Sequence, residues 1–124
     1  MIFRNIISKI GGVTVHVRDI KKAIKFYRDV LGLPLTRYDK KNNYAEFATA
    51  PVVLGLHVGT PEEKGREPGG ATGISFQVRN IDETVNDLKA RKIKITSPED
   101  QGWALVAELY DPDDNIYLIY QEKE

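Results

Sequence analysis

Two histidines and two of the glutamates combine a side-chain type with a strand position that could support metal or acid–base chemistry. His16 and His57 are its only histidines. Two imidazoles and one carboxylate form a facial triad that binds a divalent metal in some enzymes, and Glu46 or Glu108 could supply the carboxylate. Two glutamates could also transfer protons. A second interpretation stays open, in which these polar side chains only line or rim a binding pocket.

The elements that would position these side chains occur twice, 61 residues apart. Residues 12–20 and 73–81 each read as an alternating strand that ends at Asp19 or Asn80, which are good helix N-caps. An amphipathic helix and three further strands follow in each copy, so both halves are predicted as β-α-β-β-β. A doubled half-domain usually builds its site where the copies meet. The later strands are expected at residues 35–38, 44–48 and 52–58 in the first copy, and at residues 93–96, 104–110 and 116–121 in the second.

Length and charge exclude several classes of protein. The 124 residues suit one domain with a substantial core, and the 18 basic residues are balanced by 18 acidic ones. We therefore expect no nucleic-acid partner and no membrane partner, since either surface would need a basic excess or a long apolar segment. The absence of cysteine and the poor match to a signal peptide predict a cytoplasmic protein.

Three motifs together resemble the vicinal oxygen chelate superfamily, which includes glyoxalase I, extradiol dioxygenases, methylmalonyl-CoA epimerase and bleomycin-resistance proteins. They are Val-Arg-Asp-Ile followed by Phe-Tyr-Arg-Asp-Val-Leu-Gly-Leu in residues 17–33, Val-Arg-Asn-Ile in residues 78–81, and Asp-Pro-Asp-Asp-Asn in residues 111–115. The resemblance implies an α+β fold of two tandem βαβββ modules that form a curved mixed sheet around a central cavity. It implies a single domain over residues 1–124, with module one at about 11–58, a linker at 59–72 and module two at about 73–121.

The resemblance also shows where this sequence departs from the family. Enzymes of the family usually bind a divalent metal through a histidine in the first strand and a glutamate in the last strand of each module. The matching positions here are Gly12, Gly55, Gly73 and Leu118, and none of these side chains has a donor atom. We therefore expect no metal at the inherited positions and no cofactor.

A cavity without these ligands has room for a guest molecule. Strand alternation and the family's arrangement predict ligand-binding side chains from both copies, while no catalytic residue can be named. Trp103 is the sole tryptophan and suits a flat wall against a ligand ring, although core or dimer packing would explain it equally well. The predicted ligand-binding residues are Thr14, His16, Glu46, His57, Ser75, Gln77, Trp103, Glu108 and Tyr120.

Two functions from different classes remain. The first is a metal-free binding protein of the bleomycin-resistance type, which encloses an apolar or aromatic small molecule. The second is an enzyme of the superfamily, a lyase, isomerase or dioxygenase, which works through a relocated metal or through acid–base residues such as His16 or Glu46. In either case we expect a homodimer, because the family pairs two chains to cover exposed sheet edges.

Overall fold

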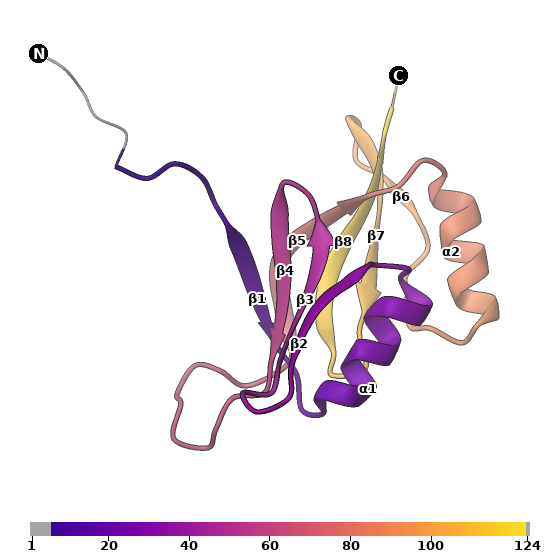
Figure 1. Ribbon diagram of the computed structural model, residues 1–124. Helices are drawn as coiled ribbons and strands as arrows, with labels where there is room; N and C mark the ends of the chain where they lie inside the picture. Colours follow the sequence, from indigo (N-terminus) through magenta and orange to yellow (C-terminus); the bar gives the residue numbers. More distant parts are fainter. Residues whose placement is uncertain (1–5, 124) are drawn as a thin grey trace, which may run out of the picture. The chain divides into compact units, whose positions relative to one another are not determined.

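The computed structural model describes residues 6–123, and the chain divides after Val58 into two compact units. Both units have the predicted β-α-β-β-β order, so the α+β fold of two tandem modules is confirmed (Figure 1). Unit 1 contains β1 (Gly12–His16), α1 (Ile20–Lys25), the π-helical segment η1 (Phe26–Val30), β2 (Leu35–Asp39), β3 (Tyr44–Thr49) and β4 (Val52–His57). Unit 2 contains β5 (Gly70–Gln77), α2 (Ile81–Ala90), β6 (Glu99–Asp100), β7 (Ala104–Tyr110) and β8 (Asn115–Glu122).

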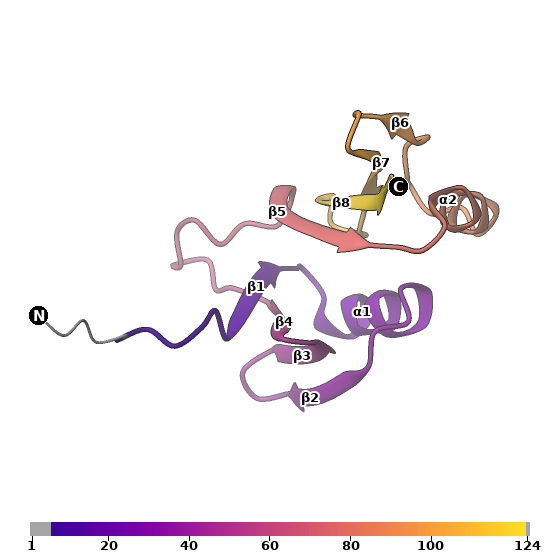
Figure 2. The ribbon, with the colours of Figure 1, turned by 90° about the horizontal axis from the view of Figure 1, so that it is seen from above.

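Unit 1 is a mixed four-stranded sheet with one face covered by its helix. The strand order is β1-β4-β3-β2, with β1 parallel to β4 and the other neighbours antiparallel. Helix α1 contacts β3 and β4 (Figure 2). Val15, Phe47 and Leu56 are buried, and alternation turns the residues between them to the opposite face.

The first helix begins where the sequence predicts and changes its winding before it ends. The Asp19 carboxylate accepts a hydrogen bond from the Lys22 backbone N–H at 3.1 Å, which satisfies one free donor of the first turn. The expected single helix is an α-helix only to Lys25, and η1 then continues with π-type bonds such as Leu31 N–H to Phe26 O at 3.1 Å. Gly32, at φ +73°, ends the segment.

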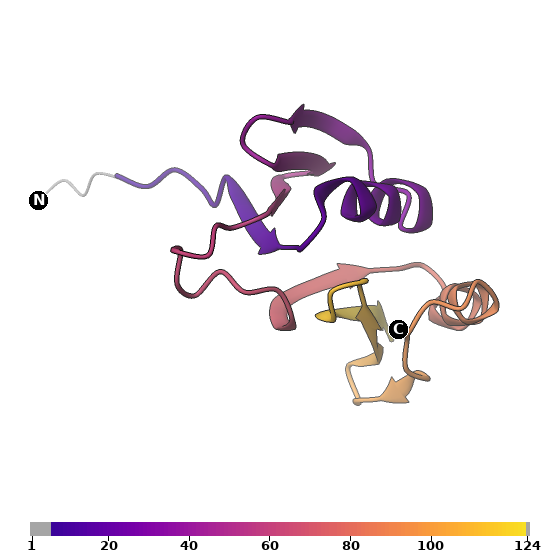
Figure 3. The same cartoon turned by 90° about the horizontal axis from the view of Figure 1, so that it is seen from below.

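Unit 2 repeats the same sheet, in the order β5-β8-β7-β6, with β5 parallel to β8. The irregular loop that joins β4 to β5 can be followed in Figure 3. It ends earlier than the linker expected at 59–72, since β5 begins at Gly70. The strand expected at residues 93–96 is wrong: Ile95 forms only an isolated bridge with Leu109, and the edge strand β6 follows after Pro98, which has no N–H to donate.

The Asp-Pro-Asp turn between β7 and β8 is held by its own buried side chains. Asp111 and Asn115 are the two polar residues with almost no exposure in the described chain. The Asp111 carboxylate accepts hydrogen bonds from the backbone N–H groups of Asp113 and Asn115 at 2.8 and 2.9 Å, and from the Asn115 amide at 2.8 Å. This motif is therefore a structural feature that fixes the register of β7 and β8. Among residues 6–123, none of the helices has the length and apolar character that a membrane span requires.

Candidate functional site

The face of unit 1 opposite α1 carries all four predicted site residues of that unit. Thr14 and Glu46 both lie beside Gly55, from β1 on one side and β3 on the other. His16 pairs with His57 across the parallel β1 and β4. We refer to this surface as the open face of unit 1. The four side chains therefore lie on one face of the sheet, as strand alternation in the sequence predicts.

The two histidines lie next to each other on this open face. Their ring centroids are 5.7 Å apart, and the rings meet edge to face at 74°. Both side chains are half-buried. Within residues 6–123, however, no group of three or more histidines and carboxylates is arranged to bind a metal ion. The pair supplies two imidazoles without the third ligand that a relocated metal would need.

Tyr44 occupies the space above Gly55, one of the four inherited ligand positions. A Cβ atom added to Gly55 would lie 2.6 Å from the Tyr44 hydroxyl and 2.8 Å from its Cε1, which is far inside van der Waals contact. The phenol ring can therefore occupy this position only because residue 55 is a glycine. Tyr44 was not among the predicted ligand-binding residues, although it shares the parity of Glu46 on β3, and this parity is the signal that could have identified it.

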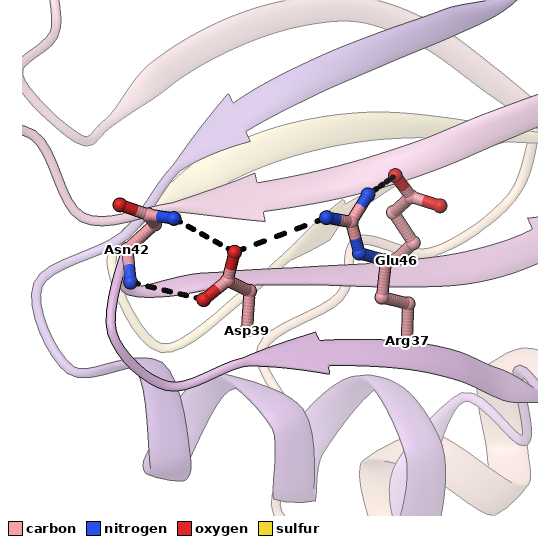
Figure 4. Close-up of polar contacts among 4 residues, drawn as sticks. All are labelled: Arg37, Asp39, Asn42 and Glu46. Carbon is pink, nitrogen blue, oxygen red and sulfur yellow. Dashed lines mark hydrogen bonds and ion pairs between the residues drawn. The ribbon is translucent and has the colours of Figure 1, made fainter.

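A chain of polar contacts runs from Glu46 to Asn42, beside the edge strand β2 (Figure 4). Arg37 lies between two carboxylates, with its nitrogens 3.6 Å from Glu46 and 3.8 Å from Asp39. Asp39 accepts hydrogen bonds from the side chain and the backbone N–H of Asn42 at 2.8 and 3.2 Å. These two bonds, and then the charge of Arg37, hold the pKa of Asp39 below its usual value. Exposed pairs of this kind add little stability, but they place the Arg37 guanidinium beside the Glu46 carboxylate.

Burial raises the pKa of Tyr44 above its ordinary value, and the hydrogen bond to Glu46 and the negative charge of Glu46 raise it further. Arg37 acts in the opposite direction. The phenol therefore stays protonated at neutral pH, and its O–H donates a hydrogen bond to the Glu46 carboxylate. Its oxygen lone pairs are left to accept a hydrogen bond from a bound molecule.

In unit 2, the predicted site residues also share the face opposite the helix. Ser75 and Glu108 lie on either side of Leu118, from β5 and β7, and Gln77 pairs with Tyr120. This is the open face of unit 2. The Tyr120 hydroxyl contacts the Gln77 amide oxygen at 3.5 Å.

Trp103 extends this face at the start of β7. Its ring lies 5.5 Å from that of Tyr120 in a tilted arrangement, and 58% of the residue is exposed. An exposed indole beside a half-buried phenol is an apolar platform with polar edges. Trp103 is thus not a core residue of unit 2, and the core-packing interpretation is wrong.

A pocket of about 270 Å³ opens where β5 bulges away from β8. The strand advances from Ala71 to Ser75 while its partner advances only from Ile116 to Leu118. Thr72 closes the bulge, because its hydroxyl donates to the Ile116 carbonyl at 2.8 Å and accepts from the Ile74 N–H at 3.1 Å. Gly73 lies inside the bulge at φ +75°, a conformation that side-chain-bearing residues rarely adopt.

These geometries decide whether the chain fits the metal that the family resemblance implies. Gly12 and Leu118 offer no donor atom, the Tyr44 ring fills the space at Gly55, and Gly73 has a left-handed backbone. The four positions do not fit a divalent metal, which needs several nitrogen or oxygen ligands in fixed geometry.

Comparison with known proteins places the chain in a family. The sequence profile of the Glyoxalase/Bleomycin resistance protein/Dioxygenase superfamily matches residues 9–117. The chain belongs to this superfamily. A curated relative, the uncharacterized protein YraH of Bacillus subtilis, is 33% identical over 91% of this chain and 98% of its own length. The bovine mitochondrial methylmalonyl-CoA epimerase is 29% identical over 75% of this chain and 59% of its own length.

Solved structures share the fold of this chain. TnmS3, an antibiotic binding protein from Streptomyces sp. CB03234, superposes with a TM-score of 0.84 at 24% identity, over 97% of this chain and all of that chain. At this level of identity the likeness establishes the fold alone.

Proposed function

We propose that this superfamily member binds a small apolar or aromatic molecule on its open faces, without a divalent metal at the inherited positions. The observation that supports this most directly is the exposed Trp103 ring beside Tyr120, with the Gln77 amide at the polar end of the pair. A planar ligand can stack on the indole and phenol while the amide bonds its polar substituent.

Unit 1 supports the same function with a different surface. The Tyr44 ring lies above Gly55, and the His16 and His57 imidazoles lie on the same face. These three rings offer a ligand flat contact surfaces with a hydroxyl and ring nitrogens at their edges. Sequestration needs only shape, apolar contact and a few fixed polar groups. TnmS3, which shares the fold, is described as an antibiotic binding protein, and this fits a binding function.

The experiment uses Trp103 as the reporter, because it is the only tryptophan of the chain. Fused-ring aromatic compounds are titrated into the protein while its tryptophan emission and melting temperature are recorded. We expect saturable quenching by at least one compound together with a higher melting temperature, since a ligand stabilises the state it binds. If no compound of the panel saturates either signal, the proposed function is wrong.

A variant pair locates the binding surface. Tyr120→Ala removes one aromatic contact, worth about 0.5–1.5 kcal/mol, so affinity should fall roughly twofold to tenfold. Tyr110→Ala is the matched control. Tyr110 is also a tyrosine of the β7–β8 pair, but the Lys94 ammonium covers its ring at 4.1 Å from the ring centroid. An equal loss of affinity in both variants would place the ligand elsewhere.

The second candidate is an enzyme, and the similarity to methylmalonyl-CoA epimerase is the observation that favours it. A relocated metal would have to use His16 and His57, which lie together without a third histidine or carboxylate among the described residues. Metal analysis of protein purified without a histidine tag separates the candidates. One equivalent of metal that survives dialysis and is lost in His16→Gln and His57→Gln would favour the enzyme.

A further inference from the structure

The pocket at the bulge of β5 combines apolar walls with one carboxylate. Its lining includes Ala71, Ile116 and Leu118 on the walls, Gly73 and Ser75 on the bulged strand, and Glu108 on β7. The walls and the missing side chain at Gly73 make the hollow, and its volume of about 270 Å³ suits a small group rather than a whole drug-sized molecule.

The Glu108 backbone is held by Thr96, while its exposed carboxylate has no ion-pair partner in the described part of the chain. Its N–H donates to the Thr96 hydroxyl at 2.8 Å, and its carbonyl accepts from the Thr96 N–H at 2.9 Å. None of the residues 6–123 forms an ion pair or a side-chain hydrogen bond with its carboxylate. The cation closest in sequence, Lys94, pairs with Asp114 at 3.6 Å.

Register places this charge beside the hollow. Glu108 and Ser75 flank Leu118 on adjacent strands of one face, and neighbouring strands lie about 4.8 Å apart. A group seated over Leu118 can therefore reach the carboxylate from one side and the Ser75 hydroxyl from the other. A protonated amine satisfies both acceptors, because an ammonium carries three donors.

We infer that the pocket at the bulge of β5 binds a protonated amine on an apolar body, with Glu108 as the residue that selects for positive charge. The inference deepens the proposed function and rests on it, since it names the charge of one part of the ligand. The apolar body contacts Ile116 and Leu118, and the ammonium lies between Glu108 and Ser75.

The test compares a charged probe with a neutral one of the same shape. 2-Phenylethylamine and 2-phenylethanol are titrated separately into isotope-labelled protein at pH 7, and amide shifts are followed by NMR. We expect the amine to bind about fivefold more tightly, in line with one partly screened ion pair. The shifts should centre on Gly73, Ser75 and Leu118, and added salt should weaken the amine but not the alcohol.

Two variants of equal charge change make the test specific. Glu108→Gln should remove the preference for the amine, whereas Glu62→Gln, an exposed glutamate in the loop before β5, should keep it. A preference for the amine that survives Glu108→Gln would overturn the inference. Equal affinities of the wild-type protein for the two probes would also overturn it, and that comparison does not depend on the stability of Glu108→Gln. Fused-ring compounds that still quench Trp103 would then show that the binding function stands without the charge selection.

Discussion

At the residue scale, Gly55 matters because it has no side chain that would collide with Tyr44. The Tyr44 ring lies where a Gly55 side chain would project, and Glu46 and Arg37 hold that ring in place. The glycine at this family ligand position therefore leaves a space, and the Tyr44 ring fills it.

Gly55→Ala should therefore destabilise the protein. The new methyl group would approach the Tyr44 ring to less than 3.0 Å, and overpacking of this kind costs about 1–3 kcal/mol. Gly11→Ala is the control, because a Cβ there meets nothing within 4 Å, and its effect should stay within about 0.5 kcal/mol. Chemical denaturation measures both. In a Tyr44→Ala background the cost of Gly55→Ala should disappear, and a cost that persists would show that the ring does not fill this space.

At the element scale, β1 has two faces that carry different properties. Val15 is only 5% exposed within the core, whereas Thr14 and His16 lie on the open face. The division into a buried and an open face follows from alternation alone, and the structure confirms it for Val15 and Val17.

Val15→Ala should lower the free energy of unfolding by roughly 1–3 kcal/mol, through lost burial and a new void. His16→Gln should lower it by less than Val15→Ala does, because the His16 side chain lies on the open face and outside the helix-packed core. Thermal melting of the two variants provides the comparison. If His16→Gln melts as early as Val15→Ala, the two faces of β1 have been assigned the wrong way round.

Strand alternation, helix caps and the family resemblance together predict the two modules and the faces of most site residues. The bulges are not predictable from the sequence, because an extra residue in one strand can be recognised only when the register of the neighbouring strand is known. The shift between Leu35 and Arg37 brings Arg37 opposite Glu46, and the shift between Ala71 and Ser75 opens the pocket in unit 2. Arg37 was therefore missed, and so was the hollow beside Glu108.

At the scale of the whole molecule, each sheet has two edge strands, β1 and β2 in unit 1, and β5 and β6 in unit 2. Ile6, Ile7 and Ile10, next to β1, are exposed by 91%, 82% and 70%. Apolar side chains beside an open strand edge favour association with another chain. These features support the expected homodimer.

We expect a dimer in sedimentation equilibrium at micromolar concentration, and Ile7→Asp together with Ile10→Asp should weaken it, because the charges would have to be desolvated at the contact. Lys9→Asp is the matched control for a new charge in the same segment, since Lys9 is already exposed and polar. A single species of 14.0 kDa in the wild-type protein would rule the dimer out.

The bulge at Gly73 also limits which substitutions this chain can accept. A mutation that placed a histidine there would force a left-handed backbone on a residue with a Cβ, at a cost of about 1–2 kcal/mol. A glutamate at position 55 would in turn have to displace the Tyr44 ring. Donor side chains at these positions would therefore need coupled substitutions, because each one must be accommodated by the local backbone or by a neighbouring ring.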